Sequence, residues 1–192
     1  MNLDINQKNN DFLILYQFLD QAVVFLWRLG LGKVFNLWPS VFGNVMIIKH
    51  RGRMSGKDFF LPLSYVEKDG AVYCTSLLNQ TTDWVNNLFE NPLLEVWMVD
   101  GWFTAKAEIL NNPIEKMIHF REILSESDVP ARFLGLDHLK MTDQELGAKI
   151  EYYSLARIHR QVPQTGKDGP GGLAWLWPFI TLFLVLKKRR RK

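Results

Sequence analysis

The chain is poor in cysteine and histidine, and this excludes two common kinds of site. Its 192 residues include one cysteine, Cys74, and four histidines, His50, His119, His138 and His159. A single cysteine cannot build an internal disulfide framework or a zinc cluster of cysteine ligands. The histidines are scattered, without the spacing of metal ligands. We therefore expect no metal site, and we expect a reducing, cytoplasmic setting.

Several other catalytic and targeting patterns are also missing. The sequence contains no Gly-x-Ser-x-Gly elbow and no pair of carboxylates at a spacing useful for acid–base catalysis. Its first residues are polar and lack the cationic start of a signal peptide, so we expect no secretory leader. The residues by themselves offer no hydrolytic site.

Positive charge is concentrated at the end of the chain. The formal net charge is +3, but the last six residues, Lys187 to Lys192, are all cationic, which leaves −3 for the rest. A body with a slight negative excess is not a general polyanion binder. We expect no binding of nucleic acid.

Hydrophobic residues make up 47% of the chain, enough for one domain with appendages. From Asp11 to Gly32 apolar residues recur at helical spacing, with Asp11 as the expected cap and Gly30 or Gly32 as the stop. This helix is apolar on almost every side, so it is buried or lies against lipid. We assign residues 1–42 to an N-terminal apolar or amphipathic helical segment.

Strand patterns follow, and they predict a mainly β fold. Asp69-Gly70 and Asp100-Gly101 are signals for tight hairpin turns. Helices are expected over 82–90, from Asn112 to about Leu124, and from Thr142 to Gly147, each with a recognisable cap. The expected strands are Val45–His50, Phe60–Val66, Ala71–Ser76, Leu93–Val99, Trp102–Leu110 and a closing strand over Lys149–Val162. We expect a small antiparallel barrel over residues 43–163, with helices packed outside it.

The end of the chain reads as a linker, residues 164–172, and an apolar, polybasic tail, residues 173–192. As a helix, Leu173–Leu186 would reach about 21 Å, short of the roughly 30 Å hydrocarbon core of a bilayer. Trp175, Trp177 and the cationic end are typical of a lipid headgroup boundary. We expect an anchor on an anionic membrane surface, at the inner face of the cell membrane. A membrane span and a tail folded back onto the domain are the alternatives.

A basic turn stands between the first two expected strands. Gly52-Arg-Met-Ser-Gly56 combines glycines with bare amides, a hydroxyl and fixed charge, which suits a phosphate. On these residues alone, a solvated basic hairpin loop is the alternative. The surrounding cations are Lys49, Arg51, Arg53 and Lys57.

The turn and the residues after it resemble the deazaflavin-dependent nitroreductase family. The turn is followed by Leu-Pro-Leu, a Lys-Asp-Gly hairpin and the small-residue strand Cys74-Thr75-Ser76. The family also shows Trp-x-x-Asn-Leu-x-x-Asn-Pro, and the matching residues here are Trp84, Asn87, Leu88, Asn91 and Pro92. The resemblance covers about residues 43 to 111.

This resemblance implies a split β-barrel of the flavin-binding type, with reduced deazaflavin (coenzyme F420) as hydride donor. It places the cofactor phosphate on Arg53, Met54, Ser55 and Gly56, with Lys49, Arg51 and Lys57 as further cations. It places the ring system beside Pro62, Leu63, Ser64 and Tyr65, and near Thr75 and Ser76. Trp84 is either a wedge between helix and barrel or a platform for the substrate. Barrels of this type often pair, so a homodimer is a further expectation.

Candidate proton donors are Tyr65 and Tyr152, with Tyr153 beside the latter. For tyrosines in barrel strands, packing is the alternative role. The implied activity is that of a membrane-associated oxidoreductase that passes a hydride to a hydrophobic acceptor such as a quinone, an enone or a nitro compound.

The chain departs from the family pattern at two places. Phe59 stands where the family usually has a second arginine, and residues 77–82 contain neither glycine nor lysine. A deazaflavin with a polyglutamate tail needs several cations, so FMN is the alternative cofactor. A third alternative is a non-catalytic barrel at the membrane surface that carries a lipid or a tetrapyrrole.

Overall fold

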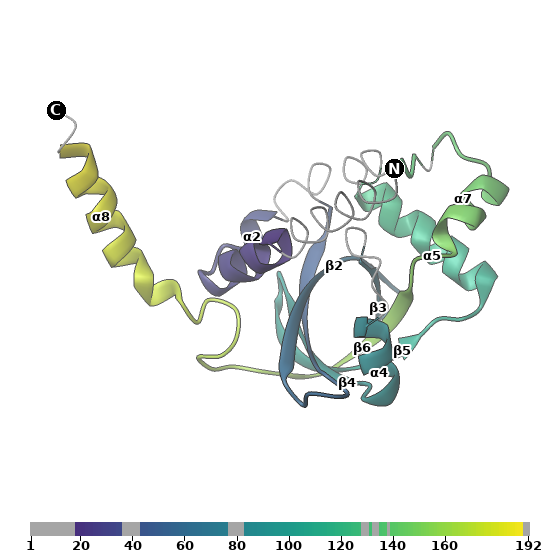
Figure 1. Ribbon diagram of the computed structural model, residues 1–192, viewed down its shortest axis with the longest axis horizontal. Coiled ribbons are helices and arrows are strands. Elements are labelled where there is room, and N and C mark those ends of the chain that lie inside the picture. Colours follow the sequence, from purple (N-terminus) through teal and green to yellow (C-terminus); the bar gives the residue numbers. More distant parts are fainter. Residues whose placement is uncertain are drawn as a thin grey trace, which may run out of the picture.

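A computed structural model of the chain describes residues 18–35, 43–76, 83–127, 131, 135–137 and 139–189 (Figure 1). Its centre is a closed barrel of antiparallel strands in the order β1-β2-β3-β6-β5-β4. The strands are β1 Val45–Arg51, β2 Asp58–Lys68, β3 Ala71–Thr75, β4 Leu93–Met98, β5 Gly101–Ile109 and β6 Leu155–Pro163. A mainly β barrel with flanking helices is the fold class that the sequence predicts, and it is confirmed.

The barrel is filled by its own side chains. Along β2 the burial alternates, so that Leu61, Leu63 and Tyr65 point into the interior core. On β1, Met46 and Ile48 point the same way, and Ile48 lies opposite Leu61. A ligand therefore has to bind outside this packed interior.

Strand β2 is paired on both sides along only part of its length. It pairs with β1 from Asp58 to Ser64, but with β3 only from Ser64 to Lys68. Pro62 lies in the part that has no β3 partner, as expected for a residue without a backbone N–H. In the described part of the chain, β2 thus offers a half-open edge at residues 58–63.

The two hairpin turns form differently. Asp69 (φ 50°) and Gly70 (φ 78°) both adopt left-handed backbone, as the Asp-Gly signal predicts. The second turn is shifted by one residue, because Met98 pairs with Gly101 and the turn lies at 99–100. Gly101 already belongs to β5, where a Cβ would stand 2.9 Å from the ring of Phe103.

Helices α4 (Asp83–Glu90) and α5 (Pro113–Glu126) pack on the outside of the barrel, and α7 (Asp143–Ile150) packs on α5. α4 buries Trp84 and Leu88 against the barrel core. α5 starts at the predicted Asn112 cap. α7 starts at the predicted Thr142 capping box.

Two of the predicted boundaries around α7 are wrong. The helix continues past Gly147 to Ile150, and the closing strand begins only at Leu155, not at residue 149. The reason is packing: Leu146 and Ile150 join Phe120 and Ile123 of α5 in a second core outside the barrel.

The helix at 18–28 and the segment that follows β6 meet beside the barrel. Residues 18–28 are helical and end at Gly30 (φ 83°), followed by the short α2 (Gly32–Phe35). Beyond β6 the chain returns to this helix, where the amide of Leu173 donates to the carbonyl of Arg28 at 2.8 Å. The predicted caps at Asp11 and Thr82 lie outside the described residues.

The tail then turns away from the barrel. After η1 (Ala174–Leu176), α8 (Trp177–Arg189) extends from the body of the protein (Figure 1). The tail thus folds back only over its first residues, and the apolar side chains of α8 are exposed. No helix in the described part of the chain is long and apolar enough to cross a bilayer.

Candidate functional site

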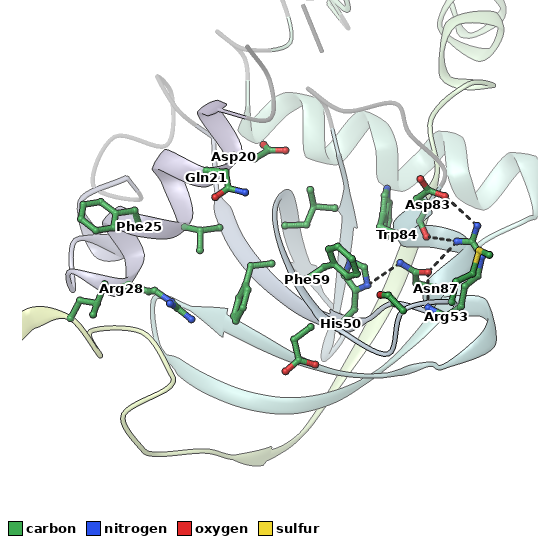
Figure 2. Close-up of a pocket in the computed structure, with 18 residues that line it drawn as sticks. Asp20, Gln21, Phe25, Arg28, His50, Arg53, Phe59, Asp83, Trp84 and Asn87 are labelled. Atoms are coloured by element: carbon green, nitrogen blue, oxygen red, sulfur yellow. Dashed lines mark hydrogen bonds and ion pairs between the residues drawn. The ribbon is translucent and has the colours of Figure 1, made fainter. Parts of the chain in front are cut away.

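A pocket of about 710 Å³ opens at the rim of the barrel, between the helix at 18–28, the basic turn and α4 (Figure 2). It also borders the half-open stretch of β2. The lining residues come from five segments: Asp20, Gln21, Val24, Phe25 and Arg28; His50, Gly52, Arg53, Met54 and Ser55; Asp58, Phe59, Phe60 and Leu61; Asp83, Trp84 and Asn87; and Leu173.

The basic turn is closed by its own backbone. The amide of Gly52 donates to the carbonyl of Lys57 at 2.8 Å, and the amide of Gly56 donates to the carbonyl of Gly52 at 2.9 Å. Gly56 has φ 64°, and a Cβ on Gly52 would lie 2.5 Å from the ring of Phe59. Both glycines are therefore needed, one for its backbone conformation and one for close packing.

Arg53 is held by α4. Its Nη2 lies 3.2 Å from Oδ1 of Asp83, and its Nη1 donates to the Asp83 carbonyl at 3.3 Å and to Oδ1 of Asn87 at 3.1 Å. The guanidinium keeps further N–H donors beyond these bonds. Arg53 is thus a positioned cation at the pocket edge, already paired with one carboxylate.

Asn87 connects this cation to His50. Its Oδ1 accepts from both the amide and Nη1 of Arg53, each at 3.1 Å, so its NH₂ group faces Nδ1 of His50 at 3.4 Å. The ring nitrogen that faces this donor is an acceptor, which puts the proton of a neutral His50 on Nε2. Both side chains are buried. The whole arrangement fixes the turn against α4.

His50 forms an uncharged part of the pocket wall. Burial lowers the pKa of its ring below the usual value, and the Arg51 backbone and Asp58 offset this only in part. The ring stacks on Phe59 with centroids 5.9 Å apart. Together with Trp84 they give the middle of the pocket flat, apolar walls (Figure 2).

The far wall of the pocket comes from the helix at 18–28 and from Leu173, which follows β6. Val24, Phe25 and Leu173 supply apolar surface, and Arg28 lies over the ring of Phe60 at 4.9 Å. Burial raises the pKa of the Asp20 carboxyl to about 6. The pocket therefore has a polar end at Arg53, and at its other end an apolar part, Val24, Phe25 and Leu173, beside the polar Asp20, Gln21 and Arg28 (Figure 2).

The structure brings four predicted binding residues to this pocket: Arg53, Met54, Ser55 and Trp84. Gly56 and Lys57 belong to the same turn, and both are exposed. Arg51 donates its Nε to the carbonyl of Gly56 at 3.0 Å, so it braces the turn from outside.

Lys49 does not line the pocket, because its ammonium is bound on the barrel wall. It lies 2.9 Å from Glu95 and 3.4 Å from Asp58. Burial alone would lower the pKa of Lys49, but the two carboxylates outweigh it and the pKa lies above its usual value. This cation does not add to the charge of the pocket.

The predicted residues of β2 and β3 lie away from the pocket. Leu63 and Tyr65 point into the barrel core, and Thr75 donates its hydroxyl to the carbonyl of Ser154 at 2.7 Å. Burial raises the pKa of Tyr65 to about 12. Pro62, Ser64 and Ser76 are likewise absent from the pocket lining.

The prediction that Tyr152 lies in the closing strand is wrong. The residue lies in the turn after α7 with 71% of its surface exposed. The structure therefore places neither candidate proton donor at the pocket.

Several pocket residues were not predicted. Asn87 was part of the matched motif, and His50 directly precedes the turn, so a local signal existed for both. Asp83 gave none. The far wall, from Asp20 to Arg28 and at Leu173, has no signal in the sequence because tertiary packing alone brings it there.

No protein-family model matches the chain, and no curated protein matches it. Several solved structures are similar to the chain. An F420-H2-dependent reductase is 18% identical over 62% of this chain and 94% of its own, with a TM-score of 0.41. A relative of general stress protein 26 from Clostridium acetobutylicum, of the pyridoxinephosphate oxidase family, is 16% identical over 61% and 75%, with a TM-score of 0.42. An FAD-binding protein from Mesorhizobium loti is 14% identical over 67% and 88%, with a TM-score of 0.40.

Proposed function

We propose that this protein is an oxidoreductase that uses reduced deazaflavin, coenzyme F420, to reduce a hydrophobic acceptor such as a quinone, an enone or a nitro compound. One observation carries the proposal. The turn that resembles a phosphate-binding motif forms the cationic edge of a pocket whose middle is aromatic and whose far wall includes the apolar Val24, Phe25 and Leu173. An anionic group, a planar ring and an apolar acceptor each find a matching surface there.

The turn has groups that fit a phosphate. The amides of Met54 and Ser55 have no acceptor within the described part of the chain, and both residues are exposed. The Ser55 hydroxyl accepts from the amide of Lys57 at 3.3 Å and is still able to donate its own proton. With the remaining N–H groups of Arg53, these would hold the anion.

The deazaflavin, when bound, supplies the hydride. The residues of the chain do the rest. Phe59 offers an exposed flat surface for a ring, with the edge of buried Trp84 beside it, and neutral His50 avoids placing a second positive charge there. Val24, Phe25 and Leu173 would hold the acceptor and exclude water.

FMN is the alternative cofactor, and one observation favours it. Lys49 is paired with Glu95 and Asp58, and Arg53 is paired with Asp83. The cations left for a ligand suit a single phosphate better than a polyglutamate tail. A flavin reductase or oxidase on the same pocket would then replace the deazaflavin enzyme.

A binding titration tests the proposal. The purified full-length protein is titrated with coenzyme F420 and, separately, with FMN, and ligand fluorescence is followed. We expect deazaflavin binding below tens of micromolar and no tight FMN binding. Tight FMN binding alone favours the alternative cofactor. If neither ligand binds and a lipid or tetrapyrrole co-purifies, the protein is a carrier and the proposal is wrong.

We also propose that the protein works at the cytoplasmic face of a membrane, where hydrophobic acceptors concentrate. The support is the apolar, polybasic tail. Cell fractionation of the tagged full-length chain tests this location, and recovery only in the soluble fraction would contradict it.

A further inference from the structure

α8 carries exposed apolar side chains on every side. Successive side chains of a helix point about 100° apart, so a run of five covers the whole circumference. The exposed residues include the consecutive run Leu182, Phe183, Leu184, Val185 and Leu186, each at least 50% exposed. In the described part of the chain, no other element covers this surface. A helix of this kind needs an apolar environment that surrounds it.

The charges at the end of α8 indicate which environment that is. The helix runs directly into Lys187-Lys-Arg-Arg-Arg-Lys192. Lys187 and Lys188 are exposed, and neither has an acidic partner among the described residues. A second copy packed in parallel would bring its own cations to the same place, whereas an anionic lipid surface attracts them.

The ends of the helix define how it would lie. At its start, the indole Nε1 of Trp177 donates to the carbonyl of Leu29 at 2.9 Å, which ties this end to the body of the protein. At its other end the cations remain with the headgroups. With both ends held at the surface and about 20 Å between them, the helix lies just below the headgroups, where the acyl chains surround its apolar side chains.

The same attachment connects α8 to the pocket. Leu173, just before η1, lines the pocket, and its amide donates to the carbonyl of Arg28, another lining residue. Phe25, on the same helix as Arg28, lines the pocket while 48% of its surface stays exposed. The apolar end of the pocket and the start of α8 therefore belong to one packed unit (Figures 1 and 2).

We infer that α8 docks this protein on an anionic bilayer and thereby holds the apolar end of the pocket, at Val24, Phe25 and Leu173, beside the lipid. The acceptor enters the pocket from the bilayer and not from water. The docking stands on α8 alone. The entry of an acceptor rests on the proposed function.

Vesicle binding tests the docking. Full-length protein is floated with vesicles of phosphatidylcholine containing 30% phosphatidylglycerol, and with pure phosphatidylcholine vesicles. We expect binding to the anionic vesicles, weakened by 1 M salt. Phe183→Asp with Leu186→Asp should bind at least tenfold more weakly, and Lys187→Gln, Lys188→Gln and Arg189→Gln together roughly a hundredfold more weakly.

A matched control substitutes exposed apolar residues far from α8. Ile114 on α5 and Leu139 before α7 are 73% and 71% exposed, and α5 and α7 lie on the other side of the barrel (Figure 1). Ile114→Asp with Leu139→Asp should leave vesicle binding unchanged. If the variant with Phe183→Asp and Leu186→Asp binds vesicles as tightly as the wild type, the docking inference is wrong. It is equally wrong if α8 substitutions change only the oligomeric state in sedimentation, because the helix then binds a second copy.

Two acceptors separate this inference from the proposed function. One is a quinone without a side chain, dissolved in water. The other is a long-chain isoprenoid quinone held in the anionic vesicles. With reduced deazaflavin as donor, the variant with Phe183→Asp and Leu186→Asp should reduce the soluble quinone at the wild-type rate. Its rate on the vesicle-borne quinone should fall at least tenfold. Equal rates of the variant and the wild type on both contradict entry from the bilayer. Vesicle binding without turnover of either quinone, and without oxidation of reduced deazaflavin by an enone or a nitro compound, contradicts the proposed function and leaves the docking intact.

Discussion

Arg53 and Asp83 form an ion pair at the edge of the pocket, with Nη2 of Arg53 3.2 Å from Oδ1 of Asp83. The cation that would bind a phosphate thus already has an anionic neighbour. Asp83 is 77% exposed at its side chain, so water screens the pair and its strength is modest. A phosphate would compete with this carboxylate for the same guanidinium.

Asp83→Asn should therefore tighten the binding of an anionic cofactor. Removal of the competing charge is worth about 0.5–1 kcal/mol, or roughly two- to fivefold in Kd. Arg53→Ala should weaken binding by about tenfold or more, because it removes a charge-assisted contact. Fluorescence titration measures both, with Arg121→Ala, which removes a surface ion pair with Asp143, as control. A weaker affinity in Asp83→Asn would mean that Asp83 positions Arg53 for the ligand and does not compete with it.

Gly52→Ala should destabilise the protein through its contact with Phe59. A Cβ at this position would lie 2.5 Å from the ring, and the nearby Ser55 hydroxyl can rotate away. We expect a loss of about 1–3 kcal/mol in the free energy of unfolding, measured in urea. In a Phe59→Ala background the added loss should largely disappear.

Gly70→Ala is the control for the double-mutant cycle of Gly52→Ala and Phe59→Ala. Its φ of 78° strains an alanine, but nothing lies within 4 Å of the added Cβ. We expect a cost of about 1 kcal/mol that Phe59→Ala does not change. If the cost of Gly52→Ala is equally independent of Phe59, then the close packing of the turn on the ring is not its cause.

Buried His50 should make stability depend on pH below neutrality. Its pKa in the folded protein is lowered by burial, whereas the unfolded residue titrates near about 6.5. As the pH falls below about 6.5, the unfolded state takes up a proton that the folded state does not, so the free energy of unfolding decreases. His50→Gln, which retains an acceptor for Asn87, should flatten this dependence. An identical slope in the variant assigns the effect to another group.

Asp20 should make the free energy of unfolding change with pH in the opposite direction to His50. Burial raises its pKa in the folded protein to about 6, above the value of about 3.9 in an unfolded chain. Between about pH 4 and pH 6 the unfolded state loses a proton that the folded state keeps, so stability falls as the pH rises. Asp20→Asn should raise the free energy of unfolding at pH 7.5 by about 1 kcal/mol and leave it nearly unchanged at pH 4. Exposed Asp168→Asn serves as control and should do neither.

Tyr65→Phe should affect packing and not catalysis. The Tyr65 side chain lies in the barrel core, and its pKa of about 12 keeps the hydroxyl protonated at ordinary pH. We expect kcat to change less than about twofold and its pH profile to keep its shape. Tyr152→Phe, in an exposed turn, should behave like the wild type. A tenfold loss of kcat in either variant, with stability retained, would restore that tyrosine as a proton donor.

Much of the local structure follows from short sequence signals. The Asn112 and Thr142 caps start α5 and α7 where expected, because a capping side chain bonds to amides only two or three residues away. Asp69-Gly70 forms its turn because both residues tolerate left-handed backbone. The shifted turn at 99–100 and the late start of β6 were missed, because in each case distant packing chose between two local possibilities.

The sequence by itself determined which segments form strands, two of the helix caps and the glycine-rich basic turn, since alternation, capping and glycine backbone act over a few residues. Only the tertiary structure decided which of the cations are available. Lys49 and Glu95 are paired across two strands of the closed barrel, and Arg53 meets Asp83 only when α4 packs on the rim. It also decided that Leu173 completes a wall begun by Asp20, because contacts between residues so far apart exist only once the chain has closed.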